Sequence, residues 1–190
     1  MGREILAIQH PVRRIGIIGV GVGTLAAYAK RGDLFRFYEI NPLVIEVAKT
    51  NFTFLNNCEG TVELVPGDAR IALAREAPQR FDLLALDAFD GHVIPVHLLT
   101  REAFALYAQH LAPGGVIAVH ATSKYTDLAP MVYRIAASIG RNAHAITNRP
   151  DLPRRVMAST WIVSRGHRQA QSDEDVWRDN YSNPIEILKF

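Results

Sequence analysis

The chain has 190 residues, 48% of them hydrophobic and 21% charged, which suits one soluble α/β domain with a sizeable core. The formal net charge is only +2, and no basic stripe or known motif indicates nucleic-acid binding. A single cysteine, Cys58, excludes an internal disulfide and, alone, a structural zinc site.

Neither targeting nor membrane insertion is indicated by the sequence. The N-terminus lacks the apolar core of a signal peptide, and no apolar run approaches the roughly 20 residues of a membrane span. We therefore expect a cytoplasmic protein without a bound metal. The basic pairs Arg13-Arg14 and Arg154-Arg155 are expected to be solvated surface charge.

Short apolar runs alternate with helical patterns, which predicts a mostly parallel sheet with helices on both faces. Asn41 and Pro42 are typical of a helix start, Thr100 is a plausible cap, and Gly140 is typical of a helix end. We expect one domain, residues 1–190, with a doubly wound sheet of seven strands. In chain order, the expected elements are strand 15–18, helix 24–30, strand 34–38, helix 42–49, strand 62–65, helix 70–76, strand 81–86, helix 101–110, strand 116–120, helix 128–139 and strands 143–147 and 160–163.

A glycine-rich turn, residues 19–24, follows the first expected strand and opens a helix. Ligands of open parallel sheets bind at the carboxyl ends of the strands, and glycines let the backbone approach a ligand closely. Thr24 stands where a dinucleotide fingerprint has its third glycine, so the spacing of Gly19, Gly21 and Gly23 favours a site for S-adenosylmethionine (AdoMet). Glu39 ends the second strand, where a carboxylate can accept hydrogen bonds from ribose hydroxyls.

Further carboxylates follow the third and fourth strands. Asp68, in Gly67-Asp68-Ala69, can accept a hydrogen bond from an adenine amino group, or it can cap the next helix. Asp87 ends the most apolar strand and should be partly desolvated, which would suit it to act as a base. Asp90 follows it closely. A loop-capping role is the alternative for both.

These motifs together resemble the spermidine synthase (aminopropyltransferase) family, which has the class I AdoMet-dependent methyltransferase (Rossmann-like) fold. The resemblance covers about residues 14–163, and residues 94–102 and 177–183 are similar to spermidine synthase-like bacterial proteins, some fused to transporter domains. The residues that carry the family resemblance are Gly19–Gly23, Tyr38-Glu39-Ile40-Asn41-Pro42, Gly67-Asp68-Ala69, Asp87 with Asp90, and Pro113-Gly114-Gly115.

The resemblance implies that decarboxylated AdoMet lies over Gly19, Gly21 and Gly23. Glu39 would then hold its ribose and Asp68 its adenine, with Ile40 and Ala69 beside them. It also implies that Asp87 accepts a proton from the attacking amine and that Asp90 helps to hold the amine substrate. The activity implied is transfer of an aminopropyl group to a diamine such as putrescine. A homodimer is the expected assembly.

Departures from the family pattern leave two alternatives open. Val22 stands where the family's glycine loop usually carries an aspartate at the donor's amino end, and Gly91 stands where proline usually follows the second acid. The first strand begins near residue 15, so we expect the chain to lack the small N-terminal β domain of typical spermidine synthases. An AdoMet-dependent small-molecule methyltransferase and a catalytically inactive nucleoside-binding module therefore remain as alternative functions.

Several histidines and tyrosines lie in segments near the proposed site. His92 and His97 flank Pro95, and His120 ends the fifth expected strand. No histidine pair has the spacing of a metal motif. We expect an ordinary role for these histidines, with contact to a substrate or cofactor as the alternative. For Tyr125 and Tyr181 we expect packing, with the lining of an amine pocket as the alternative.

Overall fold

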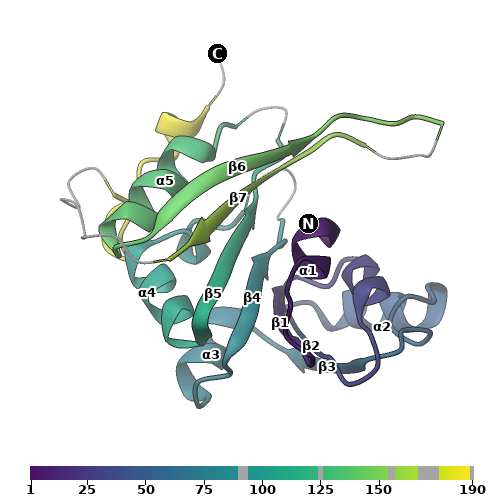
Figure 1. The fold of residues 1–190 in the computed structure, drawn as a ribbon. Coiled ribbons are helices and arrows are strands. Elements are labelled where there is room, and N and C mark those ends of the chain that lie inside the picture. Colours follow the sequence, from purple (N-terminus) through teal and green to yellow (C-terminus); the bar gives the residue numbers. More distant parts are fainter. Residues whose placement is uncertain (90–93, 124–125, 154–156, 167–175, 189–190) are drawn as a thin grey trace.

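The computed structural model describes residues 1–89, 94–123, 126–153, 157–166 and 176–188, and in these residues seven strands form one sheet (Figure 1). The strand order is β3-β2-β1-β4-β5-β7-β6. β1 to β5 are parallel to one another, and β7 is antiparallel to both β5 and β6. The strands are β1 (Arg14–Ile18), β2 (Leu34–Glu39), β3 (Thr61–Pro66), β4 (Phe81–Leu86), β5 (Leu111–His120), β6 (Asn142–Asn148) and β7 (Ser159–Arg165). The expected mostly parallel, seven-stranded sheet is confirmed.

Helices cover both faces of this sheet, as the continuous burial of its central strands β1 and β4 requires. Their starts follow local capping chemistry: the Asn41 side chain accepts a hydrogen bond from the Leu43 amide, and the Thr100 hydroxyl accepts one from the Ala103 amide. The α-helices are α1 (Gly2–Leu6), α2 (Pro42–Asn51), α3 (Ala69–Arg75), α4 (Arg101–Gln109) and α5 (Ala129–Ser138). The 3₁₀ turns are η1 (Thr24–Tyr28), η2 (Val96–Leu98) and η3 (Pro184–Ile187).

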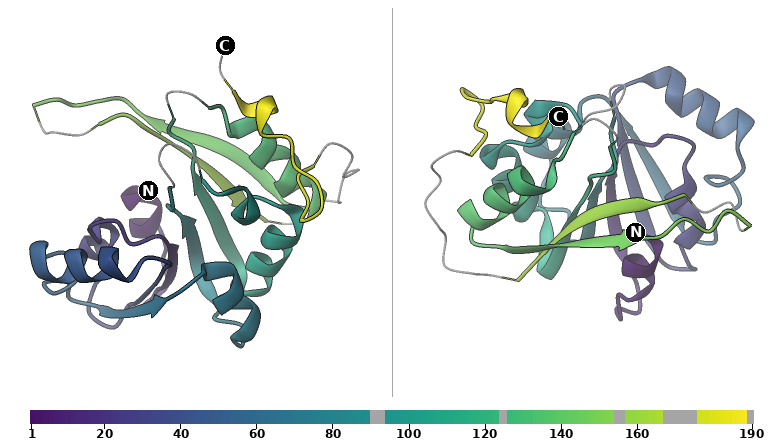
Figure 2. Two further views of the ribbon diagram at one scale, coloured as in Figure 1. Left: turned by 180° about the vertical axis from the view of Figure 1, so that it is seen from behind. Right: turned by 90° about the horizontal axis from the view of Figure 1, so that it is seen from above.

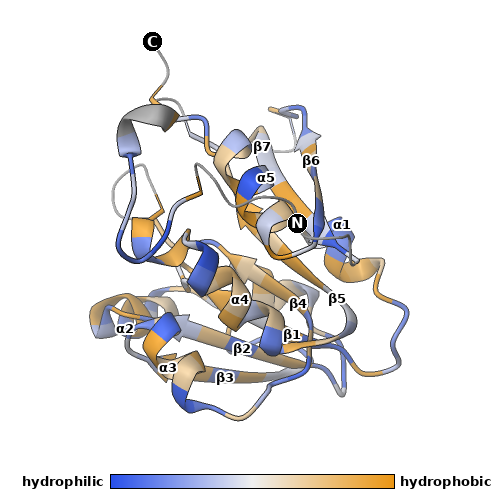
Figure 3. Ribbon diagram, turned by 90° about the vertical axis from the view of Figure 1, so that its left-hand side faces the viewer, coloured by the Kyte–Doolittle hydropathy of each residue, from blue (hydrophilic) through white to orange (hydrophobic). Residues whose placement is uncertain are grey.

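Two hydrophobic cores lie on opposite faces of the sheet. Phe35 and Phe37 of β2 pack with residues of α1, η1 and α2 on one face. Leu84 and Leu86 of β4 pack with residues of α3, α4 and α5 on the other face. Figure 3 shows the hydrophobic colouring along the central strands between these helices. The sheet is therefore doubly wound, and its strand order changes direction between β1 and β4.

Two elements differ from the sequence expectation. The helix expected over residues 24–30 is the 3₁₀ turn η1, which ends at Tyr28 because the backbone is extended at Ala29 and the Lys30 amide donates to the Asp33 carboxylate. β5 begins at Leu111, so the Pro-Gly-Gly turn lies inside the strand as a bulge. Leu111 pairs with Phe81, but the next partner of β4 is Val116.

Arg13 is buried, at 3% exposure, so the expectation that this side chain is solvated was wrong. Its guanidinium forms an ion pair with Asp33, which is also buried, and donates to the carbonyls of Ile5 and Tyr28. These partners compensate the charge and tie α1 and η1 to the ends of β1 and β2. Arg154 and Arg155 lie outside the described residues.

The edge of the sheet formed by β6 and β7 extends beyond the other strands. Figures 1 and 2 show this pair projecting away from the rest of the sheet. The start of β7 pairs with the carboxyl end of β5, where Trp161 lies opposite His120, so the base of the hairpin adjoins the edge of the sheet at which the site is predicted. In the part of the chain that the structure describes, no helix has the length and apolar character to cross a membrane.

Candidate active site

A cavity of about 820 Å³ lies at the carboxyl ends of β1, β2, β3 and β4. Its volume is within the range of sites for small molecules, and it lies where the strand order reverses. Gly23 is not part of its wall, and Asp90 lies outside the described residues. The other predicted site residues all line it: Gly19, Gly21, Glu39, Ile40, Asp68, Ala69 and Asp87.

The glycine turn brings the end of β1 against the end of β4. Gly19 has a φ of +95°, and a Cβ atom there would lie 2.5 Å from the carbonyl oxygen of Asp87. Only glycine fits this approach without a shift of the backbone. Gly21 instead faces open space, whereas Gly23 begins η1 and packs against Leu55. Gly23 thus contributes to the conformation of the turn but does not line the cavity.

Glu39 is a buried carboxylate, 9% exposed, whose two oxygens are held by the backbone. Oε2 accepts a hydrogen bond from the Val20 amide and Oε1 accepts one from the Asn41 amide, both at 2.9 Å. Each carboxylate oxygen has a second lone pair. The side chain is therefore fixed in place and can still accept hydrogen bonds from a ligand in the cavity.

Asp68 has two partners in the structure. Its Oδ1 accepts from the Ile71 amide at 2.9 Å, so the capping role for α3 is present. Its Oδ2 lies 3.0 Å from Nε2 of His97, which also lines the cavity. The expectation of an ordinary loop role for His97 missed this contact, because Asp68 and His97 belong to different segments of the wall.

Asp87 lies directly beyond β4, and its amide donates to the carbonyl of Ile18 at 2.8 Å. Its side chain is 31% exposed, which agrees with the expected partial desolvation. Its Oδ1 lies 2.7 Å from Nδ1 of His120, at the end of β5. An ordinary role was expected for His120, with a role at the site as the alternative because it ends the fifth strand; its contact with Asp87 was not predicted.

The charges on this wall have one sign. Glu39, Asp68 and Asp87 contribute three carboxylates, and none of the described residues that line the cavity is lysine or arginine. The field of such a wall favours cationic ligands. In the described part of the chain, no group of three or more histidine, cysteine or acidic side chains is arranged to hold a metal ion.

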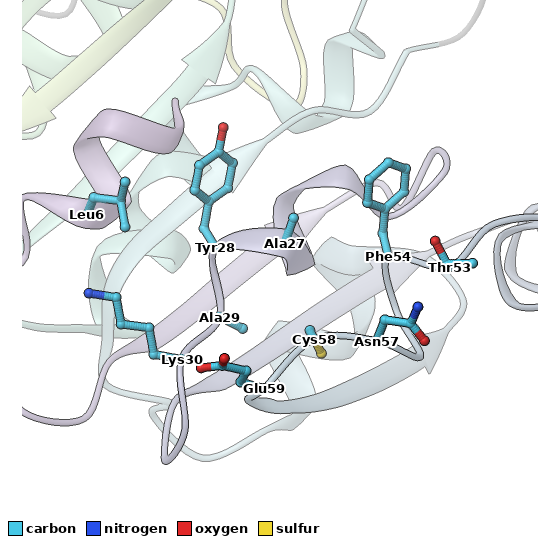
Figure 4. Close-up of a pocket in the computed structure, with 10 residues that line it drawn as sticks. All are labelled: Leu6, Ala27, Tyr28, Ala29, Lys30, Thr53, Phe54, Asn57, Cys58 and Glu59. Carbon is cyan, nitrogen blue, oxygen red and sulfur yellow. The ribbon is translucent and has the colours of Figure 1, made fainter.

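A second cavity, of about 480 Å³, lies away from the carboxyl ends of the parallel strands (Figure 4). Its lining residues come from α1, η1 and the segment between α2 and β3. Lys30 and Glu59 contribute opposite charges, and the Cys58 thiol donates to backbone carbonyls. The described residues that line this cavity do not bring several carboxylates together, as those of the first cavity do. We assign this cavity no role.

Similarity to known proteins was found at the level of both sequence and fold. No family model matches the chain. It is 35% identical over 130 residues to a polyamine aminopropyltransferase from Vibrio vulnificus, with 64% of this chain and 42% of that protein covered. It is 31% identical over 151 residues to a polyamine aminopropyltransferase from Mycobacterium tuberculosis, with 74% and 28% covered. The chain thus spans less than half the length of these curated relatives.

Solved structures confirm the fold. A probable spermidine synthase from Corynebacterium glutamicum has a TM-score of 0.67 and 19% identity, with 92% of this chain and 64% of that chain covered. Human methyltransferase-like protein 13, solved with SAH, has a TM-score of 0.64 and 17% identity, with 90% and 78% covered. The solved structures show the methyltransferase fold, and taken with the sequence relatives they support a spermidine synthase-like family.

Proposed function

We propose that the chain is a transferase that moves an aminopropyl group from decarboxylated AdoMet to a diamine such as putrescine. The observation that carries this proposal is the place of Asp87, which lines the same cavity as Glu39 and Asp68. A proton acceptor is thereby combined with groups suited to a nucleoside. The curated relatives, which are named polyamine aminopropyltransferases, support the same reaction.

The charge of the cavity supports the decarboxylated donor. Decarboxylated AdoMet carries a sulfonium and an ammonium group, whereas AdoMet adds a carboxylate. The three carboxylates of the wall attract the first form, and the described lining residues include no lysine or arginine that would pair with the carboxylate of the second. In this proposal Glu39 accepts from the ribose hydroxyls and Asp68 lies at the adenine, with Ile40 and Ala69 beside them.

The chemical step needs a neutral amine aligned with the carbon next to the sulfonium. The amine nitrogen forms the new N–C bond as the C–S bond breaks, and the electron pair of that bond leaves with methylthioadenosine. Asp87 takes the proton that the amine gives up. Asp90, which lies outside the described residues, remains our candidate for holding the other end of the diamine.

The test is release of methylthioadenosine from decarboxylated AdoMet and putrescine by the purified chain. We expect turnover by the wild type and a loss of about 100-fold or more in Asp87→Asn, because the amide cannot accept the proton. The variant should still bind methylthioadenosine, since asparagine has nearly the same shape as the aspartate that it replaces. Glu46→Gln, on the exposed side of α2, is the matched control and should keep full turnover. No product from the wild type with several diamines would contradict the proposal.

Val22 favours a second candidate, a methyltransferase that acts on a small molecule. An apolar side chain lines the cavity where the family pattern has an aspartate, so one attraction for the donor's ammonium is missing. Calorimetric titration with AdoMet and with its decarboxylated form separates the candidates. A methyltransferase should bind the carboxylated form more tightly, and an aminopropyltransferase should bind the decarboxylated form more tightly.

A further inference from the structure

A chain of hydrogen bonds runs from the candidate base across the sheet. Asp87 Oδ1 lies 2.7 Å from His120 Nδ1, and His120 Nε2 lies 2.8 Å from the Thr122 hydroxyl. The amide of Thr160, in β7, donates to the same hydroxyl at 2.7 Å. The chain therefore connects the ends of three adjacent strands, β4, β5 and β7.

The partner of Nδ1 determines that this ring nitrogen of His120 carries a hydrogen. An ionised Asp87 can only accept, so the hydrogen must be on Nδ1. The Thr122 oxygen accepts from the Thr160 amide and has a second lone pair, so it can either accept from Nε2–H or donate its own hydrogen to an unprotonated Nε2. The alternative acceptor for that hydrogen, the carbonyl of Thr160, is more distant, at 3.4 Å. In either case the pairing with an ionised Asp87 requires a hydrogen on Nδ1.

Aromatic packing fixes the plane of the same ring. His120 stacks on Trp161 with a centroid distance of 4.5 Å and an interplanar angle of 4°. The Phe89 ring is nearly perpendicular to it, with an interplanar angle of 88° and a centroid distance of 5.1 Å. A ring held on its face and at both nitrogens has little freedom to rotate, so the direction of its Nδ1–H bond is set by the fold.

We propose that His120 is a positioning residue that orients the carboxylate of Asp87 for the incoming amine. The Nδ1–H of His120 donates to Oδ1 of Asp87. Within the described residues, Oδ2 of Asp87 accepts no hydrogen bond. The carboxylate is thus held by one oxygen while the other is available in the cavity. This inference rests on the proposed function, because it gives Asp87 the role of base.

Two variants separate the hydrogen bond from the stacking. His120→Phe keeps a ring for Trp161 but has no donor, whereas His120→Asn places an amide nitrogen near the position of Nδ1 but has no ring. We expect His120→Phe to lower kcat about tenfold to a hundredfold, the range for a lost hydrogen bond to a charged group. KM and methylthioadenosine affinity should stay within about twofold. His120→Asn should recover most of the lost kcat.

Other kinetic outcomes would overturn the assignment. If His120→Phe turned over at the wild-type rate, Asp87 would not need the donor. If His120→Asn were as slow as His120→Phe, the ring itself and not its N–H would be required. Equal loss of nucleoside affinity and turnover in both variants would instead show that His120 only packs the wall of the cavity.

A second measurement does not depend on turnover. In ¹⁵N-labelled wild type, the ring nitrogens of His120, assigned by their absence in His120→Asn, should report the Nδ1–H tautomer. Asp87→Asn should lose that preference. An Nε2–H tautomer in the wild type would overturn the proposal. If no diamine is consumed but the Nδ1–H tautomer is found, the proposed reaction fails while the pairing of His120 with Asp87 stands.

Discussion

Glu39 and Val20 join the ends of two neighbouring strands through one hydrogen bond, in which the carboxylate Oε2 accepts from the backbone amide at 2.9 Å. The second oxygen accepts from the Asn41 amide, so both oxygens of Glu39 are held by backbone groups. One buried side chain thereby fixes the glycine turn after β1 and the start of α2. Glu39, which we expect to bind a ribose, thus also stabilises the backbone around the site.

Replacement of Glu39 by glutamine should weaken both the site and the fold. The amide has a single oxygen, so either the Val20 or the Asn41 N–H loses its acceptor, at a cost of about 1–3 kcal/mol in the free energy of unfolding. We also expect methylthioadenosine to bind about tenfold more weakly, measured by calorimetry. Glu46→Gln is the exposed control in α2 and should change neither quantity. Unchanged unfolding and binding in Glu39→Gln would contradict this account.

The two glycines of the turn after β1 that line the cavity, Gly19 and Gly21, should respond differently to alanine. At Gly19 a methyl group would lie 2.5 Å from the Asp87 carbonyl oxygen, so the end of β1 or of β4 must move. At Gly21 no atom lies within 4 Å, and only the left-handed backbone, costing roughly 1–2 kcal/mol, opposes the substitution. Denaturant unfolding should therefore show a clearly larger loss of stability for Gly19→Ala. Equal losses would mean that the close approach is not a constraint.

Local patterns were enough to predict most elements of the sheet and several features of the site. β4 was predicted to the residue because a strand covered on both faces is continuously apolar. The cap at Asn41 was predicted from the chemistry of that residue and of Pro42. Glu39 and Asp68 reach the same cavity because parallel strands end at the same edge of a sheet.

Contacts that depend on register were not predictable in this way. Leu86 pairs with Val119, so Asp87 and His120 follow one position further along adjacent strands. That register is set by the bulge within β5, whose size no local pattern reveals. The ion pair of Arg13 with Asp33 likewise joins positions 20 residues apart, and only the folded chain shows that the arginine is buried.

A carboxylate introduced at Val22 should strengthen selection for the donor with more positive charge. Val22 lines the cavity that already contains three acidic side chains. An added charge within about 4 Å of the ligand's ammonium contributes about 1–4 kcal/mol. We therefore expect Val22→Asp to raise the preference for decarboxylated AdoMet over AdoMet by about tenfold in calorimetric titrations. Val47→Asp, on the exposed surface of α2, is the control. An unchanged ratio of the two affinities would show that Val22 does not face the donor's amino end.

His110 should make the stability of the fold sensitive to pH. The residue lies between α4 and β5 and is 2% exposed, and its Nδ1 accepts from the Gln79 amide at 3.3 Å. Burial lowers the pKa of His110 below its usual value. The folded chain thus favours the neutral ring, whereas the unfolded chain takes up a proton near pH 6.5.

The sign of the effect follows from this difference in protonation. Below about pH 6.5 the unfolded state binds more protons, so the free energy of unfolding should fall as the pH falls, by up to about 1.4 kcal/mol per pH unit, until the folded pKa is passed. Urea unfolding between pH 7.5 and 5.5 measures this slope. His110→Asn keeps an acceptor for Gln79 but does not titrate, so its slope should be smaller than that of the wild type. His144→Asn, on the exposed strand β6, should keep the wild-type slope. The same slope in His110→Asn as in the wild type would show that this buried ring is not the group that titrates.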